Sequence, residues 1–296
     1  MVHPSGSQTH GEKNRLGKNG ASGFLCEVRG DWLMMREVFS FPSWAQQNGC
    51  CYKCKVTPSG IRQFGTEAPW RDQRLSHWEL MGRTIEEGHS VNLLYWGPWP
   101  NHQPVYGGLA LLLRLGCKRR LPGQHFLVPT AVHAWPEQRP KSFCSFLLKT
   151  KQYCEEHGVE SRLDNLTDLM LRKGPSKTPK LRAKAAEARG LVSFCKLITQ
   201  EFLSDEQPRE LAIKEAAKHL EACYNCLSSD HFDHATLSDH CTRFCLLYGS
   251  LEDNDKHVFK VKPKFHLWQE LCCMSTSNLA DHWTSRDEDY GGLLAQ

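Results

Sequence analysis

Apolar residues recur at intervals of three and four along most of the second half of the chain. This period is typical of amphipathic helices. It predicts four long helices, over residues 142–157, 183–203, 209–227 and 233–249. Gly249 is expected to end the last of them, because glycine is common just beyond a helix C-terminus. A further apolar-rich helix is expected over Phe265–Met274, so residues 142–296 are predicted to be a mainly helical domain.

The first 94 residues lack this regular period. Residues 1–23 are polar and rich in Gly, Ser, Asn and Lys, which predicts a disordered tail. Residues 24–94 alternate short apolar runs with loops punctuated by Cys and Gly, which predicts a mixed α/β region. Within it a helix is expected over residues 75–87, because Ser76 and Glu79 have the spacing of a capping box.

Residues 95–141 differ from both neighbouring regions because they contain seven prolines. Proline removes a backbone donor and breaks helices and central strands. A long irregular loop is unusual inside a compact domain. This segment is therefore predicted to be either a functional insertion or sequence that does not belong to the fold.

Composition narrows the class of protein to which the chain can belong. Hydrophobic residues make up 40% and charged residues 24%, which is the balance of a globular protein, and the net charge is only +4. No apolar run approaches the ~18 residues that cross a bilayer, and the N-terminus has no apolar leader. The fourteen cysteines are scattered, unlike those of a small secreted scaffold. A nuclear or cytoplasmic protein, neither secreted nor membrane-bound, is expected.

Basic residues concentrate between two predicted helices. Residues 172–189 hold seven Lys or Arg and one Glu. Such a segment can bind DNA weakly and without sequence preference, because neutralising phosphates releases counterions. The alternative is a solvated linker. The candidate DNA-binding residues are Arg172, Lys173, Lys177, Lys180, Arg182 and Lys184.

Two groups of cysteines have spacings that suit a metal. Cys51-x-x-Cys54 has the spacing of half a zinc site, with Cys50 or His77 as further candidate ligands. The alternative is a pair of buried or free thiols. Cys223-x-x-Cys226 is accompanied by further His and Cys residues, but it falls within a predicted helix at core spacing, where thiols pack as small apolar groups. Those neighbours are His219, His231, His234, His240 and Cys241.

Several blocks of the chain, in a shared order, resemble a transposase-like family of mobile elements related to the CACTA and KDZ groups. The blocks are residues 28–32, 38–42, 49–54, 68–71, 74–78, 179–191, 262–267 and 282–292. The resemblance implies an α+β fold, with a partial RNase H-like region followed by a mainly α-helical C-terminal half. A segment that the family carries between the first and second groups of blocks, reading roughly Asp-Trp-Leu-His, is not found in residues 98–141.

The resemblance also implies catalytic chemistry. Strand transfer by such enzymes uses two divalent metals held by converging carboxylates. By resemblance, Asp31 and Glu288 are the candidates for two of the three carboxylates. The alternative for Asp31 is a turn or helix-capping residue, and the alternative for Glu288 is a solvated charge in an acidic cluster. No third carboxylate is identified, so Mg²⁺ is expected only if the protein is active.

These observations together predict a degenerate transposase-derived protein with residual DNA and zinc binding and little or no catalysis. One alternative is an active metal-dependent transposase subunit. The other is a helical protein-interaction module.

Overall fold

A computed structural model of the chain describes residues 50–86, 139–159, 181, 185–228, 232–256, 258–274 and 278–282. The described part is 70% helical and contains no strand. Its one β-type pairing is an isolated antiparallel bridge between Cys54 and Arg74. The predicted α+β fold with an RNase H-like sheet is therefore wrong for this part of the chain, which belongs to the α-helical class.

The reason lies in how residues 50–86 satisfy their backbone hydrogen bonds. This segment forms two 3-10 turns, η2 (Gly60–Arg62) and η3 (Pro69–Arg71), and then the helix α2 (His77–Glu86). Its amides bond to nearby carbonyls, as Gln63 N does to Gly60 O at 3.0 Å. Such short-range bonds close turns and leave few groups for a neighbouring strand.

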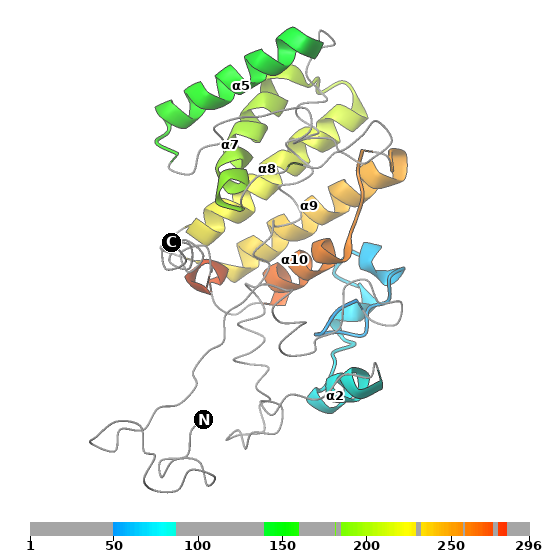
Figure 1. Cartoon of the computed structure of the whole chain (residues 1–296). Helices are drawn as coiled ribbons and strands as arrows, with labels where there is room; N and C mark the ends of the chain where they lie inside the picture. Colours follow the sequence, from blue (N-terminus) through cyan, green and yellow to red (C-terminus); the bar gives the residue numbers. More distant parts are fainter. Residues whose placement is uncertain are drawn as a thin grey trace, which may run out of the picture.

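The helices of the second half pack in chain order (Figure 1). In Figure 1 α7 lies against α8, α8 against α9 and α9 against α10, while α5 covers α7 at the far end of the stack. The short 3-10 turn η5 (Leu279–His282) follows α10 and contacts α8. The helix bounds are α5 Arg139–Glu156, α7 Ala185–Phe202, α8 Pro208–Ser228, α9 His234–Asn254 and α10 Pro263–Met274.

The predicted helices are confirmed, and one predicted helix end is wrong. Each of the five expected in residues 142–274 is present, with ends that differ by a few residues. However, α9 continues past Gly249 to Asn254. Gly249 lies inside the helix, at a position where an added Cβ would be 2.6 Å from Cε2 of Phe64. Its small size lets the aromatic ring of a distant segment approach the helix backbone.

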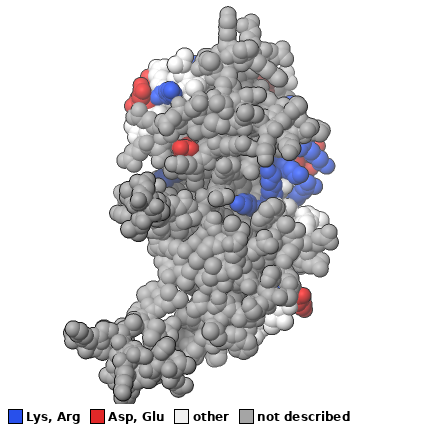
Figure 2. Space-filling model, viewed as in Figure 1, with Lys and Arg blue, Asp and Glu red and all other residues white. Residues whose placement is uncertain are grey.

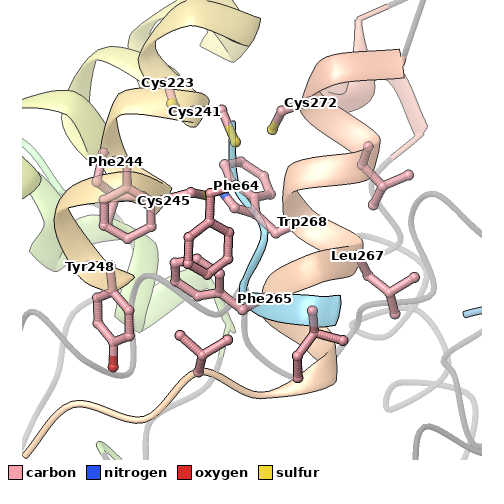
Figure 3. Close-up of a cluster of buried hydrophobic side chains, with 14 of the residues drawn as sticks. Phe64, Cys223, Cys241, Phe244, Cys245, Tyr248, Phe265, Leu267, Trp268 and Cys272 are labelled. Carbon is pink, nitrogen blue, oxygen red and sulfur yellow. The ribbon is translucent and has the colours of Figure 1, made fainter. Parts of the chain in front are cut away.

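One aromatic cluster joins the 50–86 segment to the helices (Figure 3). Phe265 of α10 lies at its centre, with its ring 4.8 Å from Tyr248 and 5.5 Å from Phe64. The Gln269 side chain also donates a hydrogen bond of 2.6 Å to the Phe64 carbonyl. Aromatic pairs at these separations add attraction to the area that they bury. Residues 50–86 and helices α8–α10 thus share one hydrophobic core.

Two helix N-termini are capped by side chains. At α2, the Glu79 carboxylate accepts from Ser76 N at 2.8 Å and Ser76 Oγ accepts from Glu79 N at 3.2 Å, which confirms the predicted capping box. At α9, the Asp233 carboxylate accepts from the backbone N–H groups of Ala235 and Thr236 at 3.1 Å. These carboxylates satisfy amides that have no partner within their helices.

Charged side chains of the described residues are partly paired. On the face drawn in Figure 2, basic side chains gather at one edge with acidic side chains beside them. Arg62 Nε lies 2.9 Å from the buried Glu252 carboxylate, and Arg209 Nη2 lies 2.9 Å from Asp255. Among the described residues, no helix is long and apolar enough to cross a membrane.

Candidate metal centre

The Cys51–Cys54 turn is fixed by local backbone contacts. The Lys53 amide points back to the Cys51 sulfur, with N···Sγ 3.3 Å. On either side of Cys54, Lys55 N donates to Gln73 O at 2.8 Å and Leu75 N donates to Lys53 O at 2.9 Å. These two bonds form the bridge between Cys54 and Arg74 and fix the backbone on both sides of Cys54.

Helix α10 presents two more side chains to the same place. His266 and Glu270 are four residues apart, so they lie one above the other on one face of the helix. Their side chains are in contact, with Nε2 of His266 3.3 Å from Oε2 of Glu270. Both residues are fully buried, at 0% exposure. Burial of such polar groups is costly unless they have partners, so the surroundings of this pair decide what it can do.

The thiols of the turn meet this His–Glu pair across more than 200 residues of sequence. Cys51 Sγ lies 2.9 Å from Glu270 Oε2, and Cys54 Sγ lies 3.3 Å from His266 Nε2. The ligand atoms of these four buried residues all lie within 4.8 Å of one another. They are the group among the described residues that could hold a metal ion.

The surroundings of the four residues are charged on one side and aromatic on another. Arg74 Nη1 forms an ion pair with the second carboxylate oxygen of Glu270, at 2.5 Å. The Trp70 and His266 rings meet edge to face, with centroids 4.8 Å apart. Nδ1 of His266 is buried and has no hydrogen-bond partner within the described part of the chain. Nε2 is therefore the ring nitrogen that faces the other candidate ligands.

Mutual contact shifts the proton affinities of these groups. Burial raises the pKa of the Cys51 thiol well above its usual value. Burial alone would lower the pKa of His266, but its contacts with Cys51 and Glu270 outweigh burial and raise it to about 9. Burial would raise the pKa of Glu270, whereas the contact with His266 lowers it to about 2. Without metal, the site at neutral pH is a buried imidazolium–carboxylate pair beside a protonated Cys51 thiol.

Sequence reasoning identified half of this group. It singled out Cys51 and Cys54 but named Cys50 or His77 as further ligands. Cys50 instead contacts the carbonyl of Val56, at 3.9 Å, and the His77 side chain lies outside the described residues. His266 and Glu270 were missed, although a His and a Glu four residues apart on a predicted helix were a detectable signal.

The second cysteine set lies in the helical core. Cys223 is buried in the hydrophobic core and Cys226 is partly exposed, while the ring nitrogens Nδ1 of His219 and His240 are 3.0 Å apart. These residues are not part of the metal-type group found among the described residues. The buried position of Cys223 in the hydrophobic core agrees with its interpretation as a core residue.

The other predicted site residues lie outside the described residues. These are the catalytic candidates Asp31 and Glu288, and the DNA-binding candidates Arg172, Lys173, Lys177, Lys180, Arg182 and Lys184. No family model, curated protein or solved structure matches this chain. The transposase-like resemblance and the DNA-binding role therefore stay predictions.

Proposed function

We propose that this chain is a zinc protein, in which one ion bound by Cys51, Cys54, His266 and Glu270 fastens the 50–86 segment to helix α10. The observation that carries the proposal is that four buried metal-binding side chains converge, with ligand atoms within 4.8 Å, from two segments far apart in sequence. Four such donors are the number that a tetrahedral zinc site requires.

The donor set favours zinc over magnesium. Two sulfurs and one imidazole nitrogen are soft or borderline ligands, whereas Mg²⁺ is held by oxygen atoms. Zinc with two thiolates, one carboxylate and a neutral imidazole has a net charge of −1. The Arg74 guanidinium, paired with Glu270, supplies the opposite charge. The charge of Lys53 also acts on the Glu270 carboxylate, so positive groups surround the anionic zinc complex.

The same features favour a structural role over a catalytic one. A catalytic zinc site has three protein ligands and keeps a fourth position open for water or substrate. Here four protein donors are available, and Cys51, Cys54, His266 and Glu270 are all buried. Bound zinc would act as a cross-link between the turn and α10, so its binding energy would contribute to the stability of the fold.

Metal analysis of the full-length protein tests the proposal. We expect about one zinc per chain, the stoichiometry of one tetrahedral site. C54S and H266A should each lose the zinc, because three ligands hold the ion far less tightly. C195S is the matched control, since Cys195 is a buried thiol of α7 outside the ligand group. Purified protein without zinc, or full zinc content in C54S and H266A, would contradict the proposal.

The wider hypothesis combines this zinc site with the predicted transposase ancestry and weak DNA binding. Its DNA-binding half depends on the basic residues 172–184, and retention on a DNA column at rising ionic strength tests it. Replacing Lys177, Lys180 and Lys184 with Gln should lower the salt concentration needed for elution, because each lost phosphate contact reduces the salt dependence. Unchanged elution would leave only the zinc part of the hypothesis.

A further inference from the structure

A second group of thiols lies between the helices, apart from the candidate zinc ligands. Figure 3 shows the sulfur atoms of Cys241 of α9 and Cys272 of α10 in the space between these helices, with Cys223 of α8 to one side of Cys241. The thiols of Cys223, Cys245, Cys272 and Cys273 all act on the pKa of Cys241. Cys273 lies against the same turn of α9 as Cys241, because its Sγ is 3.7 Å from the hydroxyl of Thr242, the next residue along the chain. Cys241 is thus the member of the group that interacts with all the others.

Cys273 differs from the other thiols in its polar surroundings. The Arg71 guanidinium lies beside it, with Nη2 3.6 Å from Sγ, and the Thr242 hydroxyl is 3.7 Å from the same sulfur. The hydrogen bond from Cys241 is the largest influence, and with Ser238, Thr242 and Arg71 it outweighs burial and lowers the pKa of Cys273 to about 5. Burial raises the pKa of Cys241 well above the usual value for a thiol. The pKa values of these two neighbouring thiols are therefore shifted in opposite directions, which favours the thiolate at Cys273 and the protonated thiol at Cys241.

Access to solvent also separates the two sulfurs. Cys273 retains 6% exposure, whereas Cys241 has none. Arg71, which faces Cys273, is itself partly exposed. Of the two cysteines, Cys273 is thus the one that retains some contact with solvent, on the side where Arg71 lies.

The arrangement does not favour a second metal ion. Within the described residues, the four-residue group of Cys51, Cys54, His266 and Glu270 is the one whose ligand atoms all lie within 4.8 Å of one another. The thiols around Cys241 do not form such a set. Two neighbouring thiols whose pKa values are shifted in opposite directions instead suit two-electron oxidation.

We infer that Cys273 and Cys241 form a peroxide-sensitive thiol pair, which on oxidation becomes a disulfide that links α10 covalently to α9. The inference rests on the contacts of Cys273 with Arg71, Thr242 and Cys241, and it does not depend on bound zinc.

The oxidation takes place in two balanced steps. The Cys273 thiolate attacks one oxygen of a hydroperoxide, the O–O bond breaks, and Cys273 becomes a sulfenic acid while the other oxygen leaves as hydroxide or alkoxide. The Cys241 sulfur then attacks the Cys273 sulfur. The S–S bond forms, the S–O bond breaks, and water leaves with the thiol proton. With hydrogen peroxide, two thiols and one peroxide give one disulfide and two waters.

Peptide mapping of the peroxide-treated, full-length holoprotein tests this inference. Trypsin places Cys241 in residues 219–243 and Cys273 in residues 265–286, because cleavage follows Lys218, Arg243, Lys264 and Arg286. We expect stoichiometric hydrogen peroxide to cross-link these two peptides and a thiol reductant to separate them. Zinc content measured on the same samples, together with the peptide that ends at Lys53, distinguishes this reaction from oxidation of the zinc ligands.

Three variants assign the sulfur atoms. C273S should abolish the cross-link, C272S should keep it, and C241S should leave a Cys273 sulfenic acid that dimedone traps. Far-ultraviolet circular dichroism of the reduced variants verifies that they are folded. A cross-link that persists in C273S, or one that is lost in C272S, would overturn the assignment.

The wild-type protein supplies a test that needs no substitution. In native protein at pH 6.5, iodoacetamide should alkylate Cys273 at least tenfold faster than the fully buried Cys195, because the thiolate is the reactive species. The rate at Cys273 should reach half its maximum near pH 5. Equal labelling of the two cysteines, or no cross-linked peptide after peroxide treatment, would refute the inference even if every variant failed to fold.

Discussion

The 50–86 segment and the α7–α9 stack are held in place by different interactions. In the stack, apolar faces at helical spacing pack on one another, and the buried residues of α9 are mostly apolar or aromatic. The 50–86 segment has only short turns and one peripheral helix, α2. It is anchored by Phe64 in the aromatic cluster and by four buried polar side chains at the candidate metal centre.

This difference bears on how each region responds to solution conditions. Apolar packing changes little with pH or chelators, because it depends on buried area and shape. A buried site of two thiols, an imidazole and a carboxylate depends on protons and on metal. The two regions should therefore be separable by experiment, although they share one hydrophobic core.

Removal of metal should have the largest effect, and this effect should be on the 50–86 segment and not on the α7–α9 stack. Mass action at free zinc 1,000-fold above Kd supplies about 4 kcal/mol of stability, which a chelator would remove. We expect a chelator to expose the 50–86 segment to trypsin at Lys55 and Arg62, while a fragment containing α7–α9 persists. The measurement is limited proteolysis followed by mass spectrometry, with added zinc restoring protection. Simultaneous cleavage in both regions would show that they depend equally on the metal.

Acidification should weaken zinc binding strongly. Before zinc binds, both Cys51 and His266 are protonated at pH 7, because their pKa values are raised, that of His266 to about 9. Zinc must displace these protons, so affinity rises with pH below these pKa values and falls as pH is lowered. Displacement of these two protons alone gives about a 100-fold change in affinity per pH unit, tenfold for each proton, and conversion of the Cys54 thiol to the second thiolate can only make the dependence steeper.

Competition with a zinc indicator dye between pH 6 and pH 8 measures this dependence. H266A, which is purified without zinc and binds added zinc more weakly, should show a slope smaller by one proton, because that variant has no imidazolium to deprotonate. A wild-type affinity that is independent of pH would contradict the protonation states assigned to the apo site.

The contrast between the regions also explains how much the sequence could predict. The helices of the stack were predicted because their apolar spacing is local information, readable over a few turns. The Ser76–Glu79 capping box was predictable for the same reason. The metal centre was predicted only as the local pair Cys51 and Cys54. Its other half, His266 and Glu270, joins it through tertiary packing, and no local pattern specifies which helix covers a turn.

Gly249 is the residue where local reasoning and packing disagreed. A glycine near the end of an apolar period is typical of a helix stop, which is why α9 was expected to end there. The contact that decides its role is with Phe64, which is 185 residues away in sequence. The α+β prediction failed in a related way, because it relied on resemblance for the region that has the weakest local periodicity.

Substitution of Gly249 should uncouple the segment from the stack at their apolar contact. G249A places a methyl group 2.6 Å from the Phe64 ring, so the ring must move, and overpacking of this kind costs about 1–3 kcal/mol. G82A in α2 is the matched control, because a Cβ there meets nothing within 4 Å. It should stabilise the protein by about 0.5–1 kcal/mol, since alanine is the better helix former. Urea denaturation measures both changes, and destabilisation by G82A alone would refute the close-approach argument.

Loss of the α9 N-cap should have the smallest effect, and it should be confined to the stack. D233A removes the carboxylate that accepts from the amides of Ala235 and Thr236, and we expect Tm to fall by about 2–4 °C. The hydrogen bonds from Thr236 and Ala235 lower the pKa of Asp233, so its contribution is present above the unfolded-state pKa and is lost as pH falls. The Tm difference between wild type and D233A should therefore shrink below about pH 4.

D253A is the control at the opposite end of α9, where a negative charge is unfavourable to the helix dipole and its removal should not lower Tm. Zinc content should be unchanged in both variants, because neither residue is a candidate ligand. If D233A lost zinc, α9 and the metal centre would be coupled. The stack and the 50–86 segment would then not be independent, even for a change as small as the loss of one N-cap.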